Sequence, residues 1–137
     1  MKVAIISYGH ADSAIPLAKA LNKHINVTLF LTLALNKTKN NVLEINQPII
    51  KSGLQTKQAT NQYLSAEIKQ YLGEDFPIRL FFYHNLKFKS IKNWILSLKL
   101  RNILQHYEII HINGQNATIF QIKLLMPFKK FVYTIHD

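Results

Sequence analysis

Histidines near the ends of apolar runs are the residues of this 137-residue chain best placed to do chemistry. Three of the six histidines, His10, His111 and His136, lie at such positions. An imidazole there can hold a hydroxyl group or move a proton near neutral pH. The remaining three are expected at element ends or on the surface: His24, His84 and His106. The simpler interpretation of His136 is a structural histidine near the edge of the sheet, whereas its position and its pairing with Asp137 favour a polar site role.

Composition excludes several kinds of site. The chain has no cysteine, so disulfides, thiolate metal sites and a cysteine nucleophile are ruled out. His106 and His111 are five residues apart without a carboxylate pair, and no metal site is predicted. With seven acidic residues and no Ser-His-Asp spacing, hydrolysis is not indicated.

Alternating apolar runs and amphipathic segments predict the elements that position these histidines. Val3–Ser7 is a continuous apolar run, typical of a strand buried on both faces of a parallel sheet. Asp12 or Ser13 can cap the helix that follows, and Ile25–Leu33 predicts a second strand. A strand, helix and strand joined by short loops form a right-handed parallel crossover. We therefore expect a parallel sheet.

The rest of the chain continues this alternation. The predicted elements are a short strand at Val42–Ile45, a loop at Asn46–Ala59, a helix capped by Thr60, a strand at Phe76–His84, a helix at Lys87–Gln105, a strand at Glu108–Ile112, a helix capped by Asn116, and a last strand reaching Ile135. The fold class predicted is α/β: a Rossmann-like open parallel sheet with helices on both faces, in a three-layer sandwich.

Ligands of open parallel sheets bind beyond the carboxyl ends of the strands. That rule selects three stretches: Tyr8–Asp12, Asn113–Asn116 and His136–Asp137. The first contains one glycine, Gly9, and matches neither the GxGxxG pattern nor a P-loop, so neither a dinucleotide nor a nucleoside triphosphate is indicated. Gly9 still allows a ligand to approach the backbone closely, against the simpler interpretation of a tight turn.

Charge is strongly unbalanced along the chain. Lys and Arg number 17 against 7 Asp and Glu, a formal net charge of +10, and no acid lies between Asp75 and Glu108. This excess favours an anionic partner or marks a solvated basic surface. The basic residues lack interleaved aromatics and a groove-binding motif, so nucleic acid is not expected as a partner.

The helix predicted at Lys87–Gln105 has two apolar flanks. The flank assigned to the sheet carries Ile91, Trp94, Ile95 and Leu98. Leu96, Leu100 and Ile103 lie on the opposite flank beside lysines, which predicts contact with an anionic membrane surface through the helix around Lys87 to Arg101. The alternative is that this flank packs under a loop or another domain. The expected location is cytoplasmic, or peripheral on the inner face of the membrane.

Three segments carry a resemblance to a known family: the opening MKVAIISYGHADSAIPLAKAL, the central YEIIHINGQNATIF and the terminal KFVYTIHD. Together they resemble glycosyltransferases of the GT-B fold, specifically glycosyltransferase family four. In that family an opening strand leads to a glycine loop and a helix. A later strand runs into a histidine and a His-Gly or Asn-Gly turn, and the next strand ends in T-x-H-D.

The resemblance implies transfer of a sugar from a nucleotide-sugar donor, which is a substrate, to a cell-envelope glycan or lipid acceptor. It also implies retention of configuration, without a metal or any other cofactor. By the same resemblance, Gly9 and His10 would lie in the loop that faces the cleft between two domains. His111, Asn113 and Gly114 would line the acceptor side. Together with Asp137, these five residues are the predicted substrate-binding residues.

His136 would approach the reacting sugar and is the predicted catalytic residue, while Asp137 would fix its turn. In this family the donor is bound by a second, C-terminal domain. The resemblance therefore implies that residues 1–137 are the N-terminal, acceptor-side domain of such an enzyme and are inactive alone. The alternative prediction is a stand-alone α/β module that binds a small anion at the same strand ends without catalysis.

Overall fold

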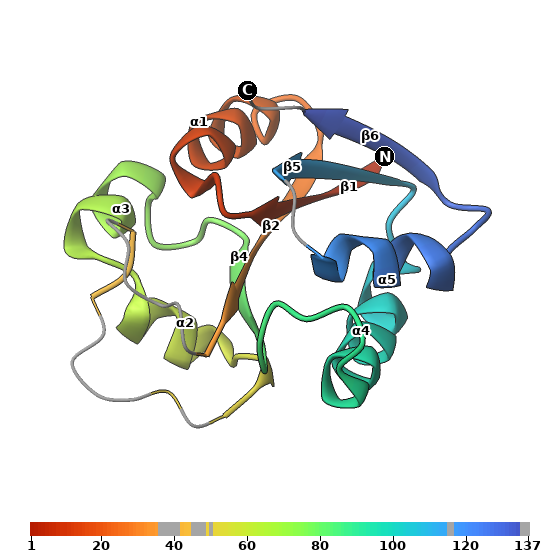
Figure 1. The fold of residues 1–137 in the computed structure, drawn as a ribbon. Coiled ribbons are helices and arrows are strands. Elements are labelled where there is room, and N and C mark those ends of the chain that lie inside the picture. The colour runs from red at the N-terminus through yellow and green to blue at the C-terminus, as the bar shows by residue number, and fades with distance from the viewer. Residues whose placement is uncertain (36–41, 45–48, 50, 115–116, 135–137) are drawn as a thin grey trace.

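A six-stranded sheet forms the centre of the structure, a computed structural model that describes residues 1–35, 42–44, 49, 51–114 and 117–134 (Figure 1). The strand order is β3-β4-β2-β1-β5-β6. The strands are β1 Lys2–Tyr8, β2 Asn26–Ala34, β3 Gly53–Leu54, β4 Ile78–Tyr83, β5 Ile109–Gly114 and β6 Lys130–Thr134. All neighbours pair in parallel except β3, which runs antiparallel to β4 at one edge.

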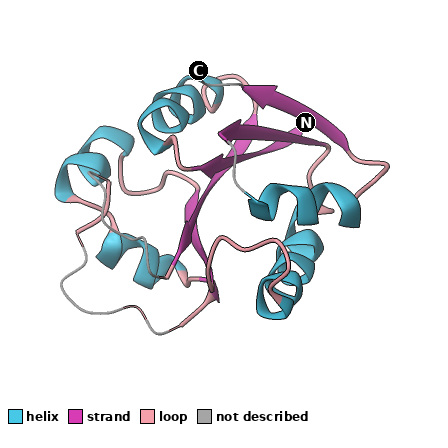
Figure 2. Cartoon of the chain, viewed as in Figure 1, coloured by secondary structure: helices cyan, strands magenta, loops and turns pink. Residues whose placement is uncertain are grey.

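Helices cover both faces of this sheet (Figure 2). One layer contains α1 (Ala11–Leu21), α2 (Lys57–Tyr63) and α3 (Ala66–Leu72), and the other contains α4 (Ile91–Leu104) and α5 (Ala117–Leu125). Each layer closes its own apolar core against one face of the sheet. The expected α/β class, with a Rossmann-like open sheet between two helical layers, is confirmed.

β1 occupies the middle of the sheet because it is apolar on both faces. Each residue from Val3 to Tyr8 is at most 5% exposed. Ile5 packs into the core beneath α1, and the next residue, Ile6, packs into the core beneath α4 and α5. A continuous run of this kind is typical of a strand covered on both sides, as the sequence predicted for Val3–Ser7.

Between β2 and β4 the structure differs from the predicted elements. The strand predicted at Val42–Ile45 is wrong for its described residues, because Leu43 forms only an isolated bridge to Leu64. The predicted loop at Asn46–Ala59 contains β3, which pairs with the edge of β4. A two-residue antiparallel strand has no periodicity of its own, so the pattern along the chain could not reveal it.

The helix that the sequence assigned to a Thr60 cap is two short helices. Thr56 caps α2 by accepting the Ala59 N–H at 3.0 Å, and Ser65 caps α3 by accepting the Ile68 N–H at 3.2 Å. Thr60 lies inside α2, fully buried, and its hydroxyl accepts the Leu80 N–H at 3.3 Å. The Thr60 prediction is therefore wrong because the hydroxyl is used by the neighbouring strand.

α4 packs on the sheet with the flank that the sequence assigned to contact with a membrane surface, so that assignment of Leu96 and Leu100 is wrong. Leu96 and Leu100 are 5% and 0% exposed, whereas Ile91 is 77% and Ile95 is 50% exposed. The predicted inward and outward flanks are thus exchanged. The buried side also carries Asn93, whose side chain accepts the His84 N–H at 3.0 Å and donates to the Asn85 carbonyl at 2.8 Å.

A buried chain of hydrogen bonds ties α4 to β4 and α5. Ser97 donates to Gln121 Oε1 at 2.7 Å, so the Tyr83 hydroxyl, 2.9 Å away, must donate to Ser97. The Gln121 amide donates to the Phe88 carbonyl at 2.7 Å. Burial raises the pKa of Tyr83 to about 12, so this hydroxyl keeps its proton. The polar residues on the buried side of α4 are therefore satisfied.

Candidate functional site

The carboxyl ends of β1 and β5 meet where the connections of the sheet diverge. These strands are parallel neighbours, and α1 follows β1 on one face while α5 follows β5 on the other (Figure 1). Such a switch point is where ligands of open α/β sheets usually bind. Gly9 forms a bridge to Gly114, so both predicted glycine turns lie side by side here. We call the group Gly9, His10, Asn113 and Gly114 the carboxyl rim.

The two glycines of the carboxyl rim have different surroundings. Both adopt positive φ angles, 102° for Gly9 and 93° for Gly114. A Cβ atom at Gly114 would lie 2.7 Å from the Tyr8 carbonyl oxygen and 2.8 Å from His10 Cδ2, whereas one at Gly9 would meet nothing within 4 Å. Gly114 therefore permits close contact of the two turns, and Gly9 leaves open space beside the rim.

Asn113 joins the two turns from beneath. It is 1% exposed, and its amide donates to the His10 carbonyl at 3.0 Å and to Ser13 Oγ at 3.1 Å. The His10 carbonyl also accepts the Ser13 and Ala14 N–H groups at the start of α1. Asn113 thus fixes the first turn of α1 relative to β5, and its predicted contact with an acceptor stays a prediction.

α1 begins earlier in the chain than the sequence predicted. Its N-cap is His10, which forms no side-chain capping bond, and neither Asp12 nor Ser13 occupies the cap. The Ser13 hydroxyl instead donates to the His10 carbonyl at 3.1 Å. The cap prediction is wrong because the β1–α1 loop is a single tight step through Gly9, which starts the helix at Ala11.

A cavity of about 180 Å³ lies against the carboxyl rim, between the ends of β1 and β2 and the start of α1. Its lining includes Gly9, Ser7, Thr32, Asp12 and the apolar side chains of Leu31 and Leu43. The Ser7 hydroxyl is buried and has no hydrogen-bond partner among the residues that the structure describes, while Thr32 donates to the Ser7 carbonyl at 2.7 Å. A buried hydroxyl without a partner is uncommon and is expected to bind a ligand or water.

Sequence reasoning did not assign Ser7 or Thr32 to a site. The available signal was a small polar residue near the carboxyl end of each of two adjacent apolar strands. Asp12 closed the Tyr8–Asp12 stretch that the strand-end rule selected, but it was given no role of its own beyond a helix cap. It lies exposed in the first turn of α1 and lines the cavity. Parallel pairing places Ser7 opposite Leu31, one residue before Thr32, and only this register shows that the two polar residues meet.

His111 lies apart from the carboxyl rim. It pairs with Val132 in the middle of β5, and its Nε2 is 2.6 Å from Thr134 Oγ1 on β6. Burial lowers the pKa of His111, so its imidazole is neutral near neutral pH. The structure therefore brings Gly9, His10, Asn113 and Gly114 together and places His111 farther back on β5, in contact with the edge strand β6.

The predicted catalytic residue His136 and its neighbour Asp137 lie outside the described residues. Within the described part of the chain, no group of three or more histidines or acids is arranged to hold a metal ion. In that same part, every helix is too short or too polar to cross a membrane.

Comparisons with known proteins identify the fold. The sequence matches no protein-family model and no curated protein. Two crystal structures of the C-terminal domain of a hydrogenase from Pyrococcus furiosus are similar in shape, with TM-scores of 0.53 and 0.51 at 14% sequence identity. The first alignment covers 98% of this chain and 89% of that one, and the second covers 97% and 89%. At this identity the likeness shows a shared α/β architecture alone.

Proposed function

We propose that this chain is the acceptor-side domain of a retaining glycosyltransferase of the GT-B fold, similar to family four. The observation that carries the proposal is the cavity beside the carboxyl rim, at the switch point of the sheet. It is lined by the buried Ser7, whose hydroxyl has no partner within the described part of the chain. The family resemblance supplies the reaction, and the position of the cavity supplies a binding site for one of its substrates.

The lining of the cavity suits a carbohydrate acceptor. A sugar presents hydroxyl groups that donate and accept hydrogen bonds, together with apolar C–H faces. Asp12 offers a carboxylate that accepts hydroxyl protons, Ser7 offers a buried hydroxyl, and Leu31 and Leu43 offer apolar surface. A few polar groups on a mostly apolar wall are typical of sites that bind small molecules.

In this proposal the residues of the carboxyl rim shape and position the site. Asn113 and Gly114 hold the β1–α1 loop against β5, and Gly9 leaves space for substrate beside the backbone. The donor nucleotide sugar is bound by a second domain, and His136 approaches the sugar with its turn fixed by Asp137. A catalytic group placed by the sheet lowers the barrier mainly by orientation and proton transfer.

One observation favours the alternative, a module that binds a small anion. The amino terminus of α1 carries no side-chain cap, and backbone N–H groups at such an end attract anions. However, Asp12 lies in that same first turn and its carboxylate repels an anion. The acceptor role accounts for Asp12, and the anion role does not, so we favour sugar transfer.

The test uses the protein encoded by the whole reading frame that contains these residues. It is incubated with a panel of nucleotide sugars and with glycan or lipid-linked acceptors, and nucleotide release is measured. Asp12→Asn is expected to raise KM for the acceptor about tenfold with kcat little changed, because it weakens a hydrogen bond to a charged group in bound substrate. Asp75→Asn is the matched control, an exposed acid before the amino end of β4.

His136→Ala is expected to lower kcat with little change in the free energy of unfolding. If no nucleotide sugar is consumed, and isothermal titration instead shows inorganic phosphate bound by the 137-residue chain, the anion-binding alternative replaces this proposal. If turnover is present but unchanged in both Asp12→Asn and His136→Ala, the assignment of the site is wrong.

A further inference from the structure

Large apolar side chains are exposed mainly on the layer formed by α4 and α5. Of the eleven such side chains in the described part of the chain, five lie on α4 or α5, and a sixth, Phe88, lies just before α4. Ile91, Ile95 and Leu98 are 77%, 50% and 41% exposed, and their spacing of four and three residues places them on one side of α4. On α5, Phe120 and Leu124 are 54% and 64% exposed.

Phe88 connects the exposed sides of the two helices. Its ring packs edge-on against Trp94 of α4, with ring centroids 5.4 Å apart. Phe88 also lines a shallow groove with three residues of α5: Phe120, Lys123 and Leu124. The exposed residues of α4, Phe88 and those of α5 therefore form one continuous surface, which we call the outer face. Single exposed apolar residues are ordinary, but a continuous apolar surface marks an interaction site.

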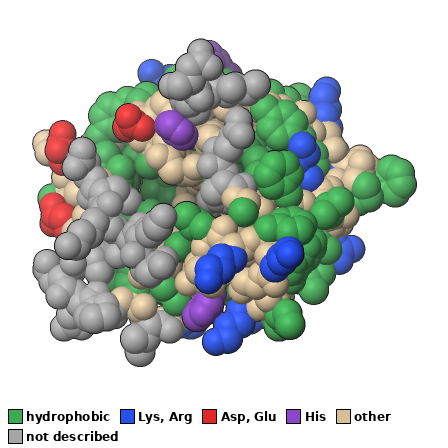
Figure 3. Space-filling view, in the orientation of Figure 1, with side chains coloured by type: hydrophobic (Ala, Val, Ile, Leu, Met, Phe, Trp, Pro, Cys, Tyr) green, Lys and Arg blue, Asp and Glu red, His purple; other side chains and the backbone are tan. Residues whose placement is uncertain are grey.

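The outer face is basic and carries no acid. Between Asp75 and Glu108 the sequence has no acidic residue, and between Glu108 and Asp137 it has none. Lys92 and Lys99, seven residues apart, lie together along one side of the apolar row of α4, and Lys123 lies among the apolar residues of α5. In the view of Figure 3 the visible acidic side chains lie over α1 and α3, and most lysines and arginines lie toward α4 and α5.

We propose that the outer face binds an anionic membrane surface. Apolar side chains that reach the boundary between headgroups and acyl chains, with lysines beside them, are the features of an interfacial helix. Anionic headgroups attract such lysines, and there is no acid on the outer face to oppose this. The proposal does not depend on sugar transfer, although it would suit a lipid-linked acceptor.

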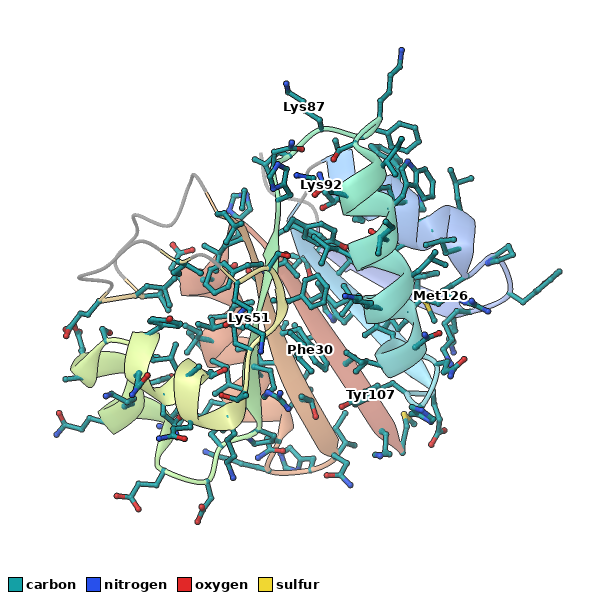
Figure 4. The ribbon with its side chains drawn as sticks, turned by 90° about the horizontal axis from the view of Figure 1, so that it is seen from below. Phe30, Lys51, Lys87, Lys92, Tyr107 and Met126 are labelled. Carbon is teal, nitrogen blue, oxygen red and sulfur yellow. The ribbon has the colours of Figure 1, made fainter. Side chains whose placement is uncertain are left out.

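The position of α4 relates the outer face to the carboxyl rim. α4 starts after the carboxyl end of β4, which lies on the same edge of the sheet as the rim. Figure 4 shows Lys87 and Lys92 together at this amino-terminal end of α4. A membrane that contacts these lysines therefore lies beside the edge of the sheet that holds the cavity.

Sedimentation of the 137-residue chain with vesicles tests the proposal. Phosphatidylcholine vesicles are compared with vesicles that also contain phosphatidylglycerol, at low and high salt. Binding to the anionic vesicles alone, weakened by salt, is expected. Lys92→Gln with Lys99→Gln should weaken this binding roughly 25-fold, since each lysine near an anionic surface contributes about fivefold. Lys57→Gln with Lys69→Gln, two exposed lysines of the other layer, is the matched control.

Apolar contact is tested separately. Ile91→Ser with Ile95→Ser should weaken binding at least tenfold, while Tyr71→Ser, an exposed aromatic of α3, should not. Trp94 is the single tryptophan of the chain, so its emission should shift to shorter wavelength with anionic vesicles. Circular dichroism confirms that each variant is folded.

Equal binding to both kinds of vesicle, or equal loss in the control variants, would overturn the proposal. So would an outer face that binds RNA, or a second copy of the chain, while the anionic vesicles stay unbound. In those cases the lysine and isoleucine variants would change nucleic-acid binding or oligomeric state without changing vesicle sedimentation.

Discussion

The carboxyl rim and the α4–α5 layer hold their side chains in place by different means. At the rim the backbone conformation fixes the arrangement. Gly114 has a φ of 93° and lies against the Tyr8 carbonyl, and the buried Asn113 amide joins the two turns. In the α4–α5 layer, side-chain packing determines which residues are buried, because α4 has apolar residues on two sides and only one side contacts the sheet. A backbone constraint can be recognised in the sequence as a glycine, whereas the sequence does not show which of two apolar flanks is buried.

The largest expected effect comes from adding one carbon atom at the rim. Gly114→Ala should lower the free energy of unfolding by about 4 kcal/mol, since it combines strain at positive φ with overpacking against a backbone carbonyl. Gly9→Ala, at a similar φ but with open space, should lower it by about 1 kcal/mol. Urea denaturation of both variants measures the difference. Equal losses would mean that the two turns do not touch.

A matched pair of leucines in α4 tests which flank is buried. Leu100→Ala removes a fully buried side chain and should lower the free energy of unfolding by about 3 kcal/mol. Leu98→Ala, two residues earlier and 41% exposed, should change it by about 0.5 kcal/mol or less. Thermal or urea denaturation gives both values. A larger loss for Leu98→Ala would restore the flank assignment that the sequence suggested and remove the outer face.

The sequence was sufficient for the elements whose pattern is strong. The continuous run at Val3–Ser7 and the alternation that follows it predicted a parallel sheet with helices on both faces, and both are confirmed. The flanks of α4 could not be assigned, because the buried side carries Asn93 and Ser97, whose partners come from other elements. A polar residue on one side of a helix predicts that this side is exposed to solvent, unless its buried hydrogen-bond partner is known.

The candidate site was predicted in part. Parallel strands bring their carboxyl ends to one edge, and this rule alone brought Gly9 and Gly114 together. Ser7 and Thr32 were missed because their meeting depends on the register between β1 and β2, which a single sequence does not show. His136 lies outside the described residues, and its catalytic role stays a prediction.

The smallest expected effect concerns His111 of β5, which belongs to neither of the two regions. Burial lowers the pKa of His111 in the folded protein below the value of about 6.5 expected in the unfolded chain. The unfolded chain therefore binds more protons, so stability falls as the pH drops through about 6.5 toward the folded pKa, and the loss is complete below it. Above the unfolded pKa the residue is neutral in both states and contributes nothing.

His111→Gln should reduce the loss of unfolding free energy between about pH 7.5 and pH 5.5, whereas His106→Gln, on an exposed residue, should not. Urea denaturation at both pH values makes the comparison, and a loss as steep in His111→Gln as in the unmodified protein would show that this imidazole is hydrated despite its contact with Thr134.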